Sequence, residues 1–232
     1  MTPDALRSAP PARLAHVADA GLTGLHWYDL TCPFCYLGQV RTQLLKQRGL
    51  TVIELPFQAH PDIPTEGIHV GPRRGPMYLS IERTASSSGL ALKWPPRLPN
   101  SRIALAAAEW VRRQRPESFS AVQARLFRAH FADGLDIGAI ETVLACVAEV
   151  MGQVDRLRDA LAGTELFDWI EQAESLGRRF GVAGTPSWRI AGRMINGFLP
   201  SDEFERVAGL AHSYSMPLGR PVGAPRTVER QP

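Results

Sequence analysis

Cys32 and Cys35 are separated by two residues, Pro33 and Phe34, at a point where a helix is expected to begin. Two cysteines at this spacing in the first turn of a helix can close a small disulfide. The first thiol would lie where the amide groups and the dipole of the helix favour an anion, so we expect its thiolate to be stabilised. Because thiolates attack disulfides and thiols do not, the motif predicts thiol–disulfide exchange.

The residue pattern predicts the elements that position the two thiols. An apolar and aromatic run predicts a strand over residues 24–30, and a helical pattern follows over 35–48, ended by a glycine. Apolar and β-branched residues predict a second strand over 51–59. A right-handed β-α-β crossover would join these strands, so they should be parallel.

The remainder of the chain is helical in its middle and returns to strands near its end. Prolines and glycines over residues 61–76 predict a long loop. Strands are expected at 187–190 and 194–197, joined by a hairpin turn, with a last helix over 201–211. The helices expected between the loop and the hairpin are 77–88, 101–115, 116–131, 137–150 with Asp136 as its N-cap, 153–161 and 164–180.

This order predicts an α/β protein with a thioredoxin fold, in which a β-α-β half and a ββα half are separated by an inserted all-helical domain. We assign residues 23–70 and 177–212 to the thioredoxin-like domain and residues 71–176 to the insertion, which should pack over the active-site end of the sheet. Residues 1–22 are expected to form a loose N-terminal arm with at most one short helix, from Asp4 or Pro11 to Ala20, and residues 213–232 a disordered tail.

Thr185 and Pro186 stand directly before a predicted strand, where a thioredoxin fold places a cis-proline. An ordinary trans loop is the alternative, but the upstream cysteine pair and the ββα ending favour the cis form. Thr185 would then offer its backbone N–H and C=O to an extended substrate.

The composition of the chain indicates the compartment in which the protein works and the classes of partner that it binds. The chain has 232 residues, 44% of them hydrophobic, a net charge of +3 and three cysteines. Cys146 lies in a helical run and is expected to be a small buried residue. We expect a cytoplasmic protein, because the first residues lack the pattern of a signal peptide and no run approaches the roughly 18 apolar residues of a membrane span. The mild basicity shows no stripe for nucleic acid.

Three segments resemble the DsbA family of thiol–disulfide oxidoreductases, and in particular its cytoplasmic FrnE-like branch. Residues 29–38 are similar to that branch's D-x-x-C-P-W-C-Y-x-G segment, residues 60–67 to its N-P-D-x-P-x-E-G loop, and residues 181–186 to its G-V-x-G-V/T-P loop. The resemblance implies Cys32 as the nucleophile and Cys35 as the resolving thiol. Phe34 replaces the usual tryptophan and His60 replaces an asparagine.

A sister group, the kappa-class glutathione transferases and 2-hydroxychromene-2-carboxylate isomerases, resembles the same regions. Ser201 and Asp202 are similar to the pair with which that group holds glutathione, although both residues are also explained as caps of the last helix. That group usually carries serine at the nucleophile position. Cysteine at both Cys32 and Cys35 therefore favours disulfide chemistry over a glutathione-dependent transferase or isomerase.

The predicted reaction leaves several roles to assign. Pro33 and Phe34 supply no histidine to pair with the Cys32 thiolate, so its pKa should be lowered less than in the strongest oxidants. Asp29 or His26 could assist proton transfer to Cys35. The alternative interpretations are that Asp29 caps the helix and that His26 is an ordinary strand residue. Pro33, Phe34, Thr185 and Pro186 are the expected substrate contacts.

The expected partners are protein or small-molecule thiols and disulfides. We expect no tightly bound cofactor beyond the redox-active disulfide. Glutathione is a candidate co-substrate. The sequence does not decide whether the protein is a monomer or a homodimer. A structural zinc site is disfavoured because no second cysteine pair or spaced histidines complete four ligands. A client-binding holdase or adaptor is a third class, compatible with the same groove.

Overall fold

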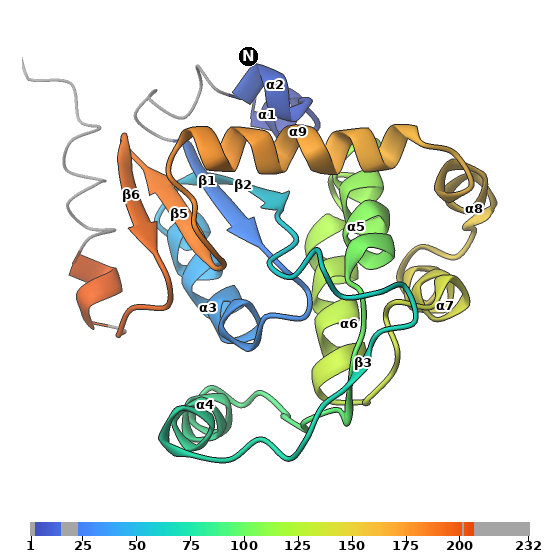
Figure 1. Cartoon of the computed structure of the whole chain (residues 1–232). Coiled ribbons are helices and arrows are strands. Elements are labelled where there is room, and N and C mark those ends of the chain that lie inside the picture. The colour runs from blue at the N-terminus through green and yellow to red at the C-terminus, as the bar shows by residue number, and fades with distance from the viewer. Residues whose placement is uncertain (1–2, 15–22, 201, 207–232) are drawn as a thin grey trace, which may run out of the picture.

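The computed structural model describes residues 3–14, 23–200 and 202–206. Its centre is a four-stranded sheet in the order β2-β1-β5-β6. β1 and β2 are parallel, whereas β5 is antiparallel to β1 and β6 is antiparallel to β5. The fold is therefore the expected thioredoxin-like one (Figure 1). The four strands are β1 (Thr23–Tyr28), β2 (Thr51–Pro56), β5 (Ser187–Ile190) and β6 (Arg193–Asn196).

The parallel pair is connected by α3 (Pro33–Gln47), as the sequence predicted. The helix is capped at Arg48 and followed by Gly49, which has a φ of 86° and turns the chain toward β2. The β5–β6 hairpin turns through Ala191 and Gly192, with φ values of 48° and 76°. Two consecutive positive φ angles suit the twist of a tight antiparallel hairpin.

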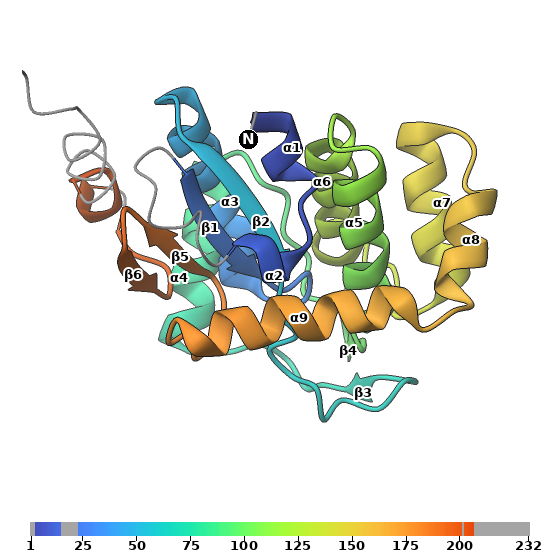
Figure 2. The ribbon, with the colours of Figure 1, turned by 90° about the horizontal axis from the view of Figure 1, so that it is seen from above.

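Helices cover both faces of the sheet. Figures 1 and 2 show α9 (Glu165–Arg179) along one face and α3 along the other. Leu25, Trp27, Ile53 and Leu55 pack under α9, whereas Leu45, Val52, Trp188 and Ile190 form a separate core with α3. Both faces are thus buried, as expected for a layered α/β sheet.

The helical block between β2 and β5 is continuous with the core around the cysteines. Tyr28, Leu30, Cys35 and Tyr36 belong to the same buried cluster as the helices of this block. The inserted helices therefore rest directly on the elements that carry the thiols. They are α4 (Pro76–Ser87), α5 (Arg102–Gln114), α6 (Phe119–Phe131), α7 (Ile140–Met151) and α8 (Asp155–Leu161).

The N-terminal segment is packed where we expected a loose arm. Helices α1 (Pro3–Arg7) and α2 (Pro11–Leu14) place Leu6 and Leu14 in the core beneath α9. The Arg112 guanidinium, itself paired with Glu109, donates to the backbone carbonyls of Arg7 and Ala9. Apolar burial and this buried cation therefore tie the segment to α5.

Several predicted boundaries shift for local reasons. Residues 116–118 form a turn, and α6 begins only at Phe119. Asp136 does not cap α7, because its carboxylate accepts the Gly138 N–H within a turn and Ala139 occupies the N-cap. The proline-rich stretches also pair as two short strands, β3 (Ile68–His69) and β4 (Arg97–Leu98), which the sequence did not predict.

The end of the chain is described only in part. Residues 202–206 are helical, in agreement with the start of the predicted last helix. The rest of that helix, Ser201 and the predicted tail lie outside the described residues, as do residues 15–22.

Candidate active site

Cys32 is the N-cap of α3, with φ −83° and ψ 117°. Its carbonyl accepts hydrogen bonds from the N–H groups of Cys35, at 3.0 Å, and Tyr36, at 3.1 Å. Pro33 occupies the first turn of the helix. Backbone N–H groups have no partner within the helix there, so a residue without an N–H costs no hydrogen bond. Cys32 is partly exposed and Cys35 is buried, and both are free thiols in this structure. The first thiol thus lies at the positive end of the helix.

The Thr185–Pro186 loop approaches Cys32 from the other half of the fold. The peptide bond between these two residues is cis. The Cys32 thiol lies 3.2 Å from the carbonyl oxygen of Thr185, to which it donates. Downstream, Ser187 holds the loop through a 2.8 Å hydrogen bond to the Gly184 carbonyl. Residues 153 positions apart in the chain therefore meet at one sulfur atom.

The surroundings of the two thiols separate their acidities. A hydrogen bond from the Cys35 side chain lowers the pKa of Cys32, with further help from Thr185, while burial and the Asp29 charge oppose it. Burial raises the pKa of Cys35 well above its ordinary value, and the neighbouring Cys32 adds to this. Cys32 is consequently the thiol that ionises first, and Cys35 the one that keeps its proton.

Asp29 lies beside the cysteines but its carboxylate is fully engaged. It accepts hydrogen bonds from the Thr31 N–H at 2.9 Å, the Thr31 hydroxyl at 3.0 Å and the Ala59 N–H at 2.7 Å. The Asp29 backbone N–H points to the Cys35 sulfur at 3.5 Å. The carboxylate thus shapes the loop before α3, and the main chain of Asp29 contacts the resolving thiol.

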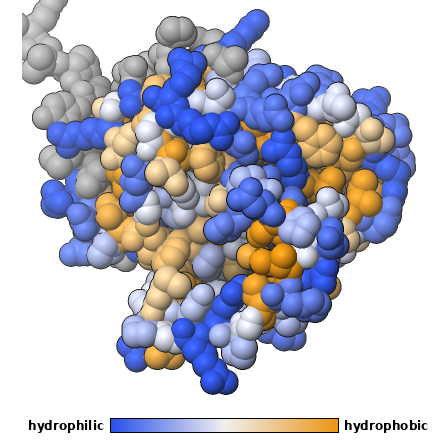
Figure 3. Space-filling model, in the orientation of Figure 1, coloured by the Kyte–Doolittle hydropathy of each residue, from blue (hydrophilic) through white to orange (hydrophobic). Residues whose placement is uncertain are grey.

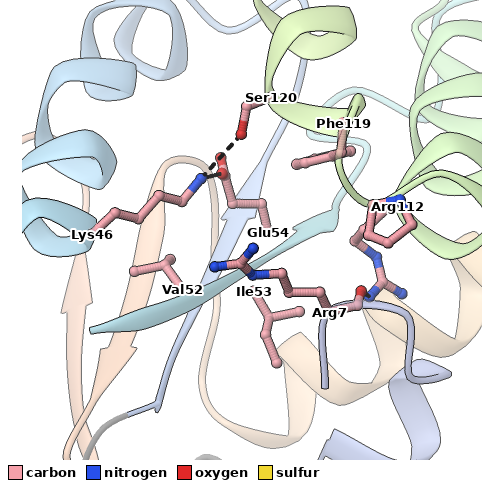
Figure 4. Close-up of a pocket in the computed structure, with 9 residues that line it drawn as sticks. Arg7, Lys46, Val52, Ile53, Glu54, Arg112, Phe119 and Ser120 are labelled. Carbon is pink, nitrogen blue, oxygen red and sulfur yellow. Dashed lines mark hydrogen bonds and ion pairs between the residues drawn. The ribbon is translucent and has the colours of Figure 1, made fainter. Parts of the chain in front are cut away.

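His26 is not brought to the cysteines. Its Nδ1 lies 3.3 Å from Glu54 and 3.2 Å from the Thr42 hydroxyl, and its ring stacks on Trp188. Its partner Glu54 binds Lys46 and lines a small cavity of about 100 Å³, which is shown in Figure 4. The contacts that His26 makes therefore belong to a buried ionic cluster between β1, β2 and α3.

A cavity of about 440 Å³ opens at Cys32, and we call it the active-site cavity. Pro33, Phe34 and Thr185 line it, together with residues of the β2–α4 region, the 94–98 segment and the end of α6. The sequence did not single out these distant lining residues, because nothing in their local pattern marks them. They are Ala59, Arg73, Met77, Tyr78, Trp94, Pro95, Leu98, His130 and Phe131.

The remaining candidate residues lie at or beyond the margin of this cavity. Phe34 stacks on Phe198, with ring centroids 6.1 Å apart. His60 is exposed and lines the cavity. Asp202 is exposed and is not among the lining residues, whereas Ser201 is outside the described residues. The contact expected between these last two and glutathione stays a prediction.

Within the ranges that the structure describes, no three or more histidine, cysteine or acidic side chains are grouped so as to hold a metal ion. In those same ranges no helix is long and apolar enough to cross a membrane.

With this geometry in view, the chain was compared with known proteins. The model of the DsbA-like thioredoxin domain family matches residues 25–208. The chain belongs to this DsbA-like family. A search of curated proteins found no match.

Solved structures share the fold of this DsbA-like chain at low sequence identity. A probable DsbA oxidoreductase from Streptomyces coelicolor is 19% identical, with a TM-score of 0.73 over 85% of this chain and 93% of that one. A 2-hydroxychromene-2-carboxylate isomerase is 18% identical, with a TM-score of 0.62 over 83% and 94%. The cytosolic disulfide reductase DsbM from Pseudomonas aeruginosa, solved with GSH, is 20% identical, with a TM-score of 0.58 over 83% and 96%.

Proposed function

We propose that this protein is a thiol–disulfide oxidoreductase of the FrnE type that works through Cys32 and Cys35. The Cys32 thiolate attacks one sulfur of a substrate disulfide, forming a mixed disulfide and releasing the first thiolate. Cys35 then loses its proton and attacks the Cys32 sulfur, which releases the second thiolate. The enzyme ends oxidised and the substrate reduced by two electrons. The reverse sequence oxidises a dithiol.

The observation that carries the proposal is the position of the Cys32 sulfur. It lies at the start of α3, 3.2 Å from the Thr185 carbonyl, with the Cys35 thiol behind it. The lowered pKa of Cys32 supplies a nucleophile, and the raised pKa of Cys35 keeps the second thiol protonated until it is needed. The Thr185 backbone lies where an extended substrate would run.

The setting of the reaction forms part of the proposal. We propose a cytoplasmic protein that exchanges with protein or small-molecule thiols and disulfides, with glutathione as a co-substrate and no tightly bound cofactor. A solved relative of the same fold is described as a cytosolic disulfide reductase and was crystallised with GSH, which makes glutathione the first compound to test.

The deciding experiment measures disulfide reduction by the pre-reduced protein, with oxidised glutathione and with a protein disulfide. We expect Cys32→Ser to lose the activity and Cys35→Ser to accumulate a mixed disulfide that mass spectrometry detects. Cys146→Ala is the matched control, because Cys146 is buried in α7, outside the active-site cavity, and should retain activity.

Two results would contradict the proposal. Full disulfide reduction by Cys32→Ser would remove Cys32 from the reaction. Glutathione-dependent turnover that is unchanged in Cys35→Ala would show that the second thiol is dispensable, and would favour the transferase or isomerase alternative.

A further inference from the structure

One wall of the active-site cavity is aromatic and is held in place by hydrogen bonds. The Tyr78 and Trp94 rings meet edge to face, with centroids 5.3 Å apart. The Trp94 indole N–H donates to Glu82 at 2.7 Å, and the neighbouring Lys93 N–H donates to the Phe131 carbonyl at 2.6 Å. Trp94 is thus fixed between α4 and the end of α6. The wall is formed before any ligand arrives.

The same cavity has an apolar character and a surface-accessible mouth. Met77, Pro95 and Leu98 extend the aromatic wall. In Figure 3, hydrophobic surface adjoins the place where the α4 segment meets the body of the molecule. Its volume of about 440 Å³ falls within the range of small-molecule sites, roughly 300–1,000 Å³. The cavity therefore fits a compact organic group attached to the sulfur that Cys32 attacks.

Among the described residues that line the cavity, Arg73 carries a fixed charge, and this charge is positive. Arg73 lies 6.0 Å from the centroid of the Tyr78 ring, and in the described part of the chain it has no ion pair with a carboxylate. No aspartate or glutamate is among the described lining residues. An anionic group on a ligand would therefore meet an unshared guanidinium beside an apolar wall, where a charge-assisted hydrogen bond is stronger than in water.

His130 of α6 also lines this end of the cavity. Its side chain is 1% exposed, and its Nδ1 has no hydrogen-bond partner among the described residues. Burial lowers the pKa of His130 to about 4, and the nearby Arg73 charge adds to this effect, while Leu135 and Asp136 oppose it. The ring is therefore neutral at pH 7, which leaves Arg73 as the cation among the described lining residues.

We propose that the active-site cavity selects small aromatic disulfides that carry a carboxylate, with the ring against Tyr78 and Trp94 and the carboxylate on Arg73. This inference rests on the proposed function. Cys32 attacks the sulfur bonded to the ring, the aromatic thiolate leaves, and Cys35 then displaces the second thiolate from Cys32. Two aromatic thiolates and one enzyme disulfide result, so no further reductant is needed for a single turnover.

The test uses four disulfides that separate the ring from the charge. Dithiobis(nitrobenzoate) has both, dithiodipyridine has only the ring, dithiodipropionate has only the carboxylate, and bis(hydroxyethyl) disulfide has neither. Single-turnover rate constants of the pre-reduced protein are measured by stopped flow or rapid quench. Each is divided by the rate constant of the same disulfide with free mercaptoethanol thiolate, which removes differences in intrinsic reactivity.

We expect the normalised rate constant to be highest for the aromatic carboxylate. Arg73→Ala should lower it about tenfold for both carboxylates, the size of one charge-assisted hydrogen bond, and by less than about twofold for the neutral pair. Trp94→Leu should lower it for both aromatic compounds. Arg74→Ala and Trp110→Leu are the matched controls, since neither residue lines the cavity, and both should behave like the unchanged protein.

The outcomes separate this inference from the function on which it rests. Equal normalised rates for the four disulfides, or equal losses for all four in Arg73→Ala, would overturn the preference while leaving disulfide exchange intact. Failure of the unchanged protein to reduce any of the four would overturn the preference, and the same failure with oxidised glutathione and a protein disulfide would overturn the proposed function as well.

Discussion

The two thiols of the active site differ because they have different surroundings, although they are three residues apart. Cys32 is partly exposed at the helix start, and its thiol donates a hydrogen bond to the Thr185 carbonyl. Cys35 is buried, and its sulfur contacts the backbone N–H of Asp29. The largest single cause that lowers the pKa of Cys32 is the hydrogen bond from the Cys35 side chain. Cys35, which we propose as the resolving thiol, therefore also favours ionisation of Cys32, the proposed nucleophile.

A first prediction at this scale concerns Cys35→Ala. Removing the donor should raise the pKa of Cys32 toward that of an ordinary thiol, so the alkylation rate at a fixed pH below that pKa should fall. The measurement is the pH profile of iodoacetamide alkylation at Cys32, followed by mass spectrometry. Cys35→Ser keeps a hydroxyl donor, so the pKa of Cys32 in that variant should lie between its values in the unchanged protein and in Cys35→Ala.

The control for that profile is Cys146→Ala, whose Cys32 midpoint should match the unchanged protein. An identical midpoint in Cys35→Ala would mean that the helix start and Thr185, rather than Cys35, set the acidity of Cys32.

At the scale of elements, the approach of α9 to the sheet depends on a residue without a side chain. A Cβ on Gly177 would lie 2.9 Å from the Trp27 indole nitrogen and 3.2 Å from the Phe57 ring. The Trp27 N–H is itself bound to the Ala173 carbonyl at 3.0 Å, so the indole has little freedom to move. The spacing between α9 and β1 therefore requires glycine at this position.

We predict that Gly177→Ala destabilises the fold by about 1–3 kcal/mol, the usual cost of overpacking a well-filled core. Equilibrium denaturation by urea measures the change in unfolding free energy. Gly163→Ala is the matched control, because a Cβ there has only an ordinary 3.6 Å contact with the Ala160 carbonyl. A neutral or stabilising result for Gly177→Ala would show that α9 can shift away from β1 without loss.

At the scale of the whole molecule, one buried carboxylate links the β-α-β half of the fold to the inserted helices. Glu54 of β2 is 4% exposed and is bound by His26 of β1 and Lys46 of α3, and Lys46 also reaches Ser120 of α6. Burial by itself would raise the pKa of Glu54, but these partners outweigh it and lower the pKa from 4.5 to about 2. The charged form is therefore the one that the folded state prefers.

The sign of the resulting pH dependence follows from that lowered pKa. The Glu54 contribution is complete above the unfolded value near 4.5 and is lost as the pH falls to about 2. We predict that this group alone removes about 3 kcal/mol of unfolding free energy across that interval. Glu54→Gln should show a correspondingly shallower loss on acidification, measured by urea denaturation at successive pH values.

The exposed Glu117→Gln is the control and should follow the unchanged protein. A Glu54→Gln protein with the same acid dependence as the unchanged protein would contradict the assigned role of the carboxylate.

The sequence predicted local elements well where a period or a breaker residue marks them. The strand before Cys32, the helix after it and the β5–β6 hairpin lie where the pattern placed them, because burial of apolar residues and the conformational freedom of glycine act over a few residues. Strands β3 and β4 were missed because two residues each, among prolines and glycines, carry no period.

The packing of α1 and α2 was missed for a different reason. These two helices pack against residues far away in the chain, including Leu25 and Ile53. The Arg112 guanidinium also binds the Arg7 carbonyl. Short helices with few apolar residues give no sign of such partners.

By itself, the amino-acid sequence predicted the Cys32–Cys35 pair, the four strands of the central sheet with the helix between β1 and β2, and the Thr185–Pro186 loop as a second candidate part of the site. These features depend on residue type and short spacing. Only the tertiary structure showed that the Thr185 carbonyl contacts the Cys32 sulfur and that His26 contacts Glu54. It also showed which residues line the cavity at Cys32. Contacts between distant segments depend on how helices stack against the sheet, and that packing is a property of the whole folded chain.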